Sequence, residues 1–146
     1  RGSNAGIKKG MAVITQEGVV GRVLRTTSMT SDVVTILDLM SAVDAIIERS
    51  RARGVVEGLT EEFCSMKFTL RTDDIQVGDL LISSGLGGIF PKGVPVGTVA
   101  KVDKKQFGIT QDVAIRPSVN FFKLEEVMVV TQQKVEVVEK EIEKKK

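Results

Sequence analysis

The chain has 146 residues, of which 42% are hydrophobic, and its 21 Lys and Arg residues nearly balance 19 Asp and Glu residues, giving a formal net charge of +2. This composition is typical of one folded domain or two very small ones, and it argues against a disordered chain or a strongly basic polyanion binder. There is no histidine and only one cysteine, Cys64, which excludes a Ser-His-Asp triad, histidine ligation of a metal, an internal disulfide and a thiolate zinc cluster.

Short runs of β-forming residues follow one another along the chain, separated by turn residues about every ten positions, which is typical of all-β proteins. The predicted strands cover residues 11–15, 18–27, 32–37, 53–59, 62–70, 79–84, 95–103, 107–116 and 126–131. Residues 39–49 fit either a short helix or a strand, and their β-branched side chains favour the strand. No apolar run reaches the roughly 20 residues that cross a bilayer, and the abrupt start of the chain indicates a piece of a longer protein.

The last residues, 132–146, have a different pattern. Val135, Val138 and Ile142 follow helical spacing, and Glu-Lys pairs lie four positions apart on the same segment. An isolated helix of this length is marginal in water. A frayed helix or a solvated charged tail is therefore expected, with docking to a partner as the alternative.

Two stretches of the chain resemble each other. The first has marker glycines at Gly10 and Gly21, which are 11 positions apart, and the second has them at Gly78 and Gly97, which are 19 positions apart. The second copy therefore carries 8 extra residues, which fall in a glycine-rich segment at residues 83–92. An internal duplication indicates two similar structural units.

Many short strands in a small chain avoid exposed edges by closing on themselves. Together with the duplication, this predicts an all-β fold of two small antiparallel β-barrels related by an internal repeat. The first barrel is expected at residues 1–71 and the second at residues 72–131, followed by a short charged tail at residues 132–146. This boundary is approximate, because a strand of one unit could pair across it.

No catalytic, cofactor-binding or metal-binding residue is predicted, and the chain is not expected to be an enzyme. Ser84 precedes a glycine-rich loop, but there is no histidine to accept its proton. Ser83 and Ser84 are instead expected to close a turn. The glycines at residues 85–88 lack the Gly-Lys-Ser/Thr ending of a P-loop. Cys64 is expected to be an inert, half-buried thiol, since no base or cationic helix end is evident near it.

A cluster of arginines is the first candidate for a contact surface. On an extended segment Arg49, Arg51 and Arg53 would lie on one face and form a cationic stripe able to pair with carboxylates or phosphates. The alternative is a solvated strand edge that resists edge-to-edge pairing. The sequence does not decide between these two roles.

The glycine-rich segment is the second candidate. It carries Leu86, Ile89 and Phe90, followed by Lys92, on a backbone shaped by glycine and proline. Large apolar side chains in such a loop either cap the open end of the second barrel or contact another subunit or protein. Capping is the simpler of the two expectations.

Several of these segments together resemble the MreC family of bacterial cell-shape proteins. The resemblance rests on residues 6–11, 17–23, 51–54, 77–81 and above all 84–97, and it covers residues 2–130. It implies the extracytoplasmic β-domain of a membrane-anchored scaffold, built from two barrels similar in shape to trypsin-like proteases but not catalytic. The tail beyond residue 131 is not part of the resemblance.

The same resemblance implies a function, a location and partners. The function would be a structural scaffold of the cell elongation machinery that maintains cell shape. The domain would lie in the periplasm, held at the bacterial inner membrane by an N-terminal helix and coiled coil that this chain lacks. The implied partners are a second copy, in a dimer or filament, penicillin-binding proteins and other rod-complex membrane proteins, without nucleic acid or a cofactor.

A small-barrel nucleic-acid-binding module is the alternative function. The three arginines would then contact phosphates, and binding would weaken steeply with salt. The chain has no Tyr or Trp and its 6 Phe residues are scattered, so a platform for base stacking is poorly supported.

Overall fold

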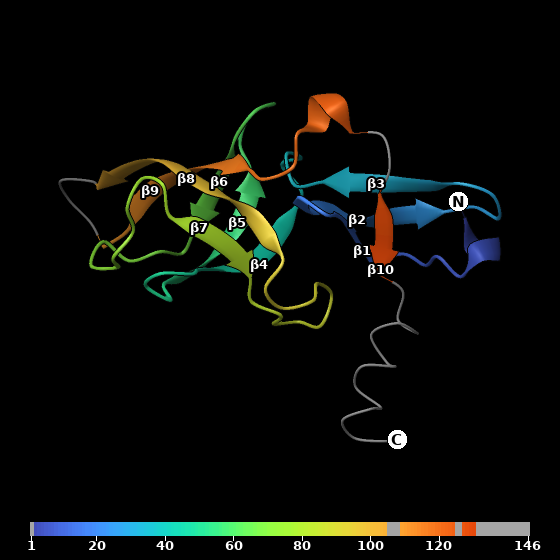
Figure 1. Ribbon diagram of the computed structural model, residues 1–146, viewed down its shortest axis with the longest axis horizontal. Coiled ribbons are helices and arrows are strands. Elements are labelled where there is room, and N and C mark those ends of the chain that lie inside the picture. Colours follow the sequence, from blue (N-terminus) through green and yellow to red (C-terminus); the bar gives the residue numbers. More distant parts are fainter. Residues whose placement is uncertain (1, 105–108, 125–126, 131–146) are drawn as a thin grey trace, which may run out of the picture.

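The computed structural model describes residues 2–104, 109–124 and 127–130. Two units lie side by side along the long axis of the molecule, a closed six-stranded barrel and a four-stranded sheet (Figure 1). The other regular elements among the described residues are two 3-10 helices, η1 (Ser3–Ala5) and η2 (Phe121–Lys123). The all-β prediction is confirmed, while the predicted tail at residues 132–146 lies outside the described residues.

The described residues form ten strands, which make up the two units. In chain order they are β1 (Ala12–Thr15), β2 (Gly18–Thr26), β3 (Ser31–Thr35), β4 (Ala42–Ile47), β5 (Arg53–Gly58), β6 (Cys64–Lys67), β7 (Leu80–Ser83), β8 (Pro95–Lys104), β9 (Gln111–Pro117) and β10 (Met128–Val130). Because β4 falls within residues 39–49, the strand interpretation of that segment is confirmed.

Strand pairing divides the chain differently from the predicted boundary between residues 71 and 72. The barrel closes in the order β4-β5-β6-β9-β8-β7, so strands from both sides of that boundary belong to it. The reason is edge pairing: β4 covers the free edge of β7, and β6 covers the free edge of β9. The described residues of the first unit form an open sheet, β10-β1-β2-β3, in place of the first predicted barrel.

The duplicated segments have the same local structure. Gly10 and Gly78 both have a left-handed φ, of 91° and 95°. Each donates its N–H to a carbonyl in the second strand of its hairpin, Gly10 to Val23 in β2 at 2.8 Å and Gly78 to Val99 in β8 at 2.9 Å. A bulge interrupts the pairing of β1 with β2 and, at the equivalent place, the pairing of β7 with β8. Second bulges interrupt the pairing of β2 with β3 and of β8 with β9. The repeat thus spans three strands, β1–β3 and β7–β9.

Side chains from two connections close the ends of the barrel core. Buried aliphatic side chains and Met66 fill its interior. Ile75, which is 5% exposed, enters from the link between β6 and β7, and Phe90, which is 8% exposed, enters from the loop between β7 and β8. The barrel is therefore a packed core rather than an open channel.

Cys64 lies in this core and has no reactive surroundings. It is fully buried, and burial raises the pKa of its thiol to about 12. The thiol donates a hydrogen bond to the carbonyl of Ile36 at 3.2 Å. The predicted inert thiol is confirmed, with the correction that it is fully rather than half buried.

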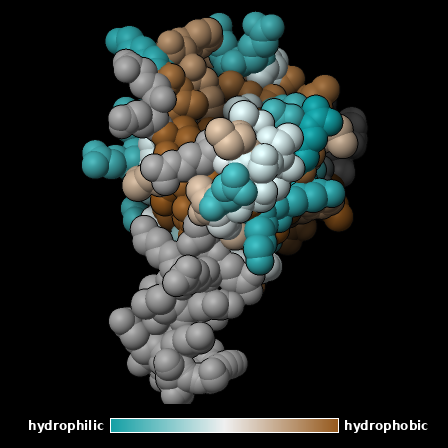
Figure 2. All heavy atoms as spheres, turned by 90° about the vertical axis from the view of Figure 1, so that its right-hand side faces the viewer, coloured by the Kyte–Doolittle hydropathy of each residue, from teal (hydrophilic) through white to brown (hydrophobic). Residues whose placement is uncertain are grey.

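The sheet unit has a smaller core of its own, formed by Ile7, Val13, Val20, Val23 and Val119. Seen from the side of η1 and the turn between β2 and β3, hydrophobic side chains are visible between hydrophilic ones (Figure 2). Met29, in that turn, is 73% exposed. Single exposed apolar residues of this kind are normal on a protein surface.

Candidate protein-contact surfaces

The two predicted groups of contact residues lie toward opposite ends of the barrel. Strand β4 runs from the end that faces the sheet unit to the outer end, so the turn that follows it, with Arg49 and Arg51, lies at the outer end (Figure 1). Strand β7 is antiparallel to β4, and the loop that follows it, with Leu86 and Ile89, lies at the end facing the sheet unit. The structure does not bring the two groups into one surface.

Two serines hold the base of the β7–β8 loop. Ser83 is fully buried; its hydroxyl donates to the carbonyl of Pro91 and accepts the N–H of Val94 at 2.9 Å. The hydroxyl of Ser84 donates to the Asp44 carboxylate at 2.7 Å. The prediction that these serines close a turn is confirmed, and the loop is attached to β4 as well as to its own strands.

The apolar side chains of this loop divide between the two predicted roles. Phe90 points into the core, whereas Leu86 and Ile89 are 52% and 43% exposed. Lys92 is also exposed. The tip turns through two glycines at residues 87–88 with φ of 84° and 73°, a conformation that other residues rarely adopt. Phe90 therefore caps the core of the barrel, and Leu86 and Ile89 form an exposed apolar surface.

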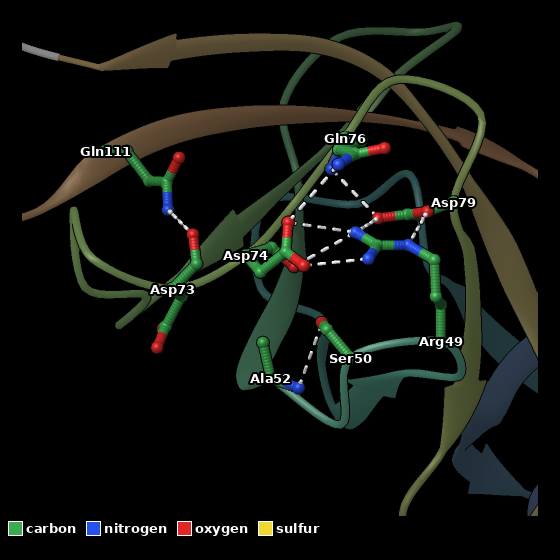
Figure 3. Close-up of polar contacts among 8 residues, drawn as sticks. All are labelled: Arg49, Ser50, Ala52, Asp73, Asp74, Gln76, Asp79 and Gln111. Atoms are coloured by element: carbon green, nitrogen blue, oxygen red, sulfur yellow. Dashed lines mark hydrogen bonds and ion pairs between the residues drawn. The ribbon is translucent and has the colours of Figure 1, made fainter.

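Arg49 is bound to two carboxylates. Its guanidinium lies between Asp74 and Asp79, with contacts of 2.7 Å to the first and 2.9 Å to the second (Figure 3). Both carboxylates accept two hydrogen bonds from it. Such paired contacts are stronger and more specific than a single surface ion pair. Arg49 thus joins the β4–β5 turn to the link between β6 and β7.

The predicted arginine stripe is not formed. The three residues do not lie on one extended segment, because the chain turns between β4 and β5, and Arg51 has a left-handed φ of 67°. Of the three, Arg53 alone lies in a strand, where it is 3.5 Å from the carboxylate of Asp44. Arg51 and Arg53 are exposed, so each can contact a partner only as a separate cation.

The Arg49 contacts predict a pH dependence of stability. Hydrogen bonding to Arg49 lowers the pKa of Asp74 and of Asp79 below the ordinary value of 3.8. A lowered pKa in the folded state stabilises the protein above the unfolded value, and this stabilisation disappears as the pH falls through the folded values. Thermal unfolding of the wild type and Arg49→Met, compared from about pH 7 to about pH 2, should show a difference that is constant above pH 3.8 and shrinks below it. A difference that does not depend on pH would contradict the assignment.

Sequence reasoning missed Asp79, Asp74 and Gln111 as structural residues. Asp79 is 9% exposed and Gln111 is 3% exposed. The amide group of Gln111 donates to the carbonyls of Leu70, at 2.6 Å, and Asp73, at 3.3 Å. The duplication held a signal for Asp79. It follows the marker glycine Gly78, whereas the equivalent residue after Gly10 is the apolar Met11. Nothing in the local sequence pointed to Gln111.

The sequence also gave no indication of a groove of about 370 Å³. Its walls come from the connections between β3 and β4, between β5 and β6, and between β9 and β10. Arg116 lies 5.4 Å from the centre of the Phe63 ring at its edge, and Phe122 beside them is 84% exposed. These residues are far apart in sequence, so their proximity depends on the tertiary fold.

Within the described ranges, no group of three or more acidic, Cys or His side chains is placed to hold a metal ion. The same residues contain no helix that is long and apolar enough to cross a membrane.

Comparison with known proteins gives consistent matches over most of the chain. The family described as rod shape-determining protein MreC, barrel core, matches residues 1–131. The cell shape-determining protein MreC of Listeria monocytogenes is 31% identical over 134 residues, which cover 88% of this chain and 45% of that protein. This chain therefore spans less than half of that relative.

Solved structures match as well. A crystal structure of MreC from Pseudomonas aeruginosa has a TM-score of 0.85 at 30% identity, covering 89% of this chain and 84% of that one. The structure described as a complex between penicillin-binding protein PBP2 and MreC from Helicobacter pylori matches with a TM-score of 0.69 at 18% identity, covering 81% of this chain and 74% of that one. The second match shows the shared fold alone.

Proposed function

Because this chain belongs to the MreC family of rod shape-determining proteins, a family of structural proteins rather than enzymes, we propose that it is the barrel core of a scaffold of the bacterial cell elongation machinery. It maintains cell shape by self-association and by binding proteins of peptidoglycan synthesis. The domain lies in the periplasm, and the longer protein is anchored in the inner membrane through an N-terminal segment.

The proposed partner class rests on a relative. The MreC of Helicobacter pylori has been solved in complex with the penicillin-binding protein PBP2, and it shares the fold of this chain. We propose that a penicillin-binding protein is also a partner here, together with other membrane proteins of the rod complex. The nucleic-acid alternative has less support, because Arg49 is already paired with two carboxylates and the arginine stripe is absent.

The contact surface that we propose is the exposed pair Leu86 and Ile89, with Lys92 beside it. The observation that carries this assignment is the combination of exposure with rigidity. Both side chains are about half exposed, yet their loop is fixed at its base by the buried Ser83 and from below by Phe90. A preformed loop loses little conformational entropy on binding, so its apolar side chains contribute more of their burial energy to affinity. Arg51 and Arg53 are proposed as secondary contacts at separate places.

The test is a charge substitution on this pair. We expect Leu86→Glu and Ile89→Glu, in the full-length protein, to weaken binding to the penicillin-binding protein of the same bacterium at least about tenfold, as for residues at the centre of an interface. Affinity would be measured by surface plasmon resonance, and self-association of the same variants by sedimentation over a range of concentrations.

Met29→Glu is the matched control, since Met29 is also exposed and apolar but lies in the sheet unit. It should leave both measurements unchanged. Unaltered binding and self-association in folded Leu86 and Ile89 variants would remove this loop from the proposed interfaces. Phe90 is unsuitable for the test because it is part of the core.

A further inference from the structure

Residues 68–79 cross the outer end of the barrel. They connect β6 to β7, and in the order β4-β5-β6-β9-β8-β7 these two strands stand three places apart in either direction around the barrel. The connection therefore has to span the full width of the barrel mouth. It forms no strand, apart from one isolated bridge between Leu70 and Thr110. Midway along it, Ile75 is inserted into the core. We call this segment the strap.

Polar contacts with the strap come from both sides of the barrel mouth. On one side, Arg49 binds the carboxylates of Asp74 and Asp79 (Figure 3). On the other side, the Gln111 side chain donates to the carbonyls of Leu70 and Asp73. The strap also has internal hydrogen bonds, such as the Leu70 N–H to the Asp73 carboxylate at 2.8 Å. These contacts hold a segment that buries only one large side chain near its middle.

Both ends of the strap have a left-handed backbone. Phe68, the first residue after β6, has a φ of 64°, and Gly78, two residues before β7, has a φ of 95°. For a bulky residue such as phenylalanine this conformation is strained, and it persists only when the surroundings hold it. Since Phe68 is 76% exposed, burial of its own side chain does not compensate for the strain. A strained residue at one end and a glycine at the other are places where the backbone torsion angles can change when the strap moves.

The closed strap also leaves one buried acceptor unsatisfied. The side-chain carbonyl oxygen of Gln111 is buried and has no hydrogen-bond partner among the described residues. Burying an acceptor without a hydrogen-bond partner costs free energy, so it destabilises the closed structure. Together with the strain at Phe68, this opposes closure of the strap.

We propose that the strap opens and closes as one unit, independently of the barrel strands, and that Arg49 is its latch. Opening separates Arg49 from its two carboxylates, withdraws Ile75 from the core and releases the strain at Phe68. The outer end of the barrel then presents one surface when the strap is closed and another when it is open. In the open state the apolar site that Ile75 occupied is exposed. A partner that binds one of them shifts the balance between the two states.

Hydrogen exchange of the whole chain, followed by mass spectrometry, tests the latch. In Arg49→Met, exchange in peptides covering residues 70–79 should be at least about tenfold faster than in the wild type, because several charge-assisted hydrogen bonds are lost. Peptides covering β5, which pairs only with β4 and β6, should exchange as in the wild type. The matched control is Arg53→Met, which removes an exposed arginine with one 3.5 Å contact and should change neither region.

Asp74→Asn provides a second variant, since Asp74 is exposed and the substitution keeps the size of the side chain. It should speed exchange in residues 70–79 in the same direction as Arg49→Met. Unchanged exchange of the strap in both variants would show that Arg49 is not its latch. Equal acceleration in the strap and in β5 would show that the strap unfolds only with the barrel, and would equally overturn the proposal.

Discussion

Phe90→Ala is expected to lower the free energy of unfolding by about 3–4 kcal/mol, the usual cost of truncating a buried phenylalanine. Phe90 closes the end of the barrel that faces the sheet unit and is 8% exposed, so its removal leaves a cavity against the aliphatic core. The surrounding strands are paired on both edges, so the structure relaxes only partly around this cavity. Urea unfolding, followed by circular dichroism, measures the difference.

Leu86→Ala in the same loop is the control. Leu86 is 52% exposed, so its truncation should cost less than about 1 kcal/mol. If the two substitutions have equal effects, Phe90 does not act as a plug of the core. If only Phe90→Ala greatly lowers the free energy of unfolding, charge substitutions for binding experiments should be made at Leu86 and Ile89, where they leave the core intact.

Gly21→Ala is expected to destabilise the sheet unit by about 3 kcal/mol, at the upper end of the range for overpacked sites. A Cβ atom on Gly21 would lie 1.8 Å from the carbonyl oxygen of Val34 on the neighbouring strand, so the backbone has to move. Gly97 is the equivalent residue of the repeat, where a Cβ atom would lie 2.5 Å from a methyl group of Ile115. It would also lie 2.6 Å from the backbone carbonyl oxygen of Arg116, but because this approach is wider than the 1.8 Å at Gly21, Gly97→Ala should cost about 2 kcal/mol.

Gly87→Ala separates this steric effect from backbone strain. Gly87 has a φ of 84° and open space around its Cβ position, so alanine should cost about 1 kcal/mol through the left-handed conformation alone. Thermal and urea unfolding of the three variants gives the ranking. A Gly21→Ala variant no less stable than Gly87→Ala would contradict the close approach of β2 to β3.

The duplication was the most informative part of the sequence about the fold. It predicted two equivalent hairpins, and the structure extends the equivalence to a third strand with bulges in matching places. Marker glycines reveal such a repeat because Gly10 and Gly78 need left-handed φ values, and Gly21 and Gly97 have no room for a side chain. The left-handed turns are local, whereas the close approaches come from a neighbouring strand, but both leave a glycine at a fixed position that the sequence shows in each copy.

The arginine segment shows where sequence reasoning failed. Alternation on an extended strand was assumed for Arg49, Arg51 and Arg53, but the chain reverses direction there. The partners of Arg49 follow it by 25 and 30 positions, across two strands and a link. No spacing rule connects residues that meet only because β4 and β7 are neighbours in a closed barrel.

The sequence by itself determined the all-β class, the repeat, the absence of histidine chemistry and the glycine-rich loop that marks the family. Each of these follows from residue types or from short-range periodicity. Tertiary structure alone decided that β4–β6 close one barrel with β7–β9, that Phe90 enters the core while Leu86 and Ile89 stay outside, and that Arg49 holds the strap. The physical reason is that side-chain burial and ion pairing depend on which strand edges meet, and edge pairing is a property of the closed sheet and not of any single segment.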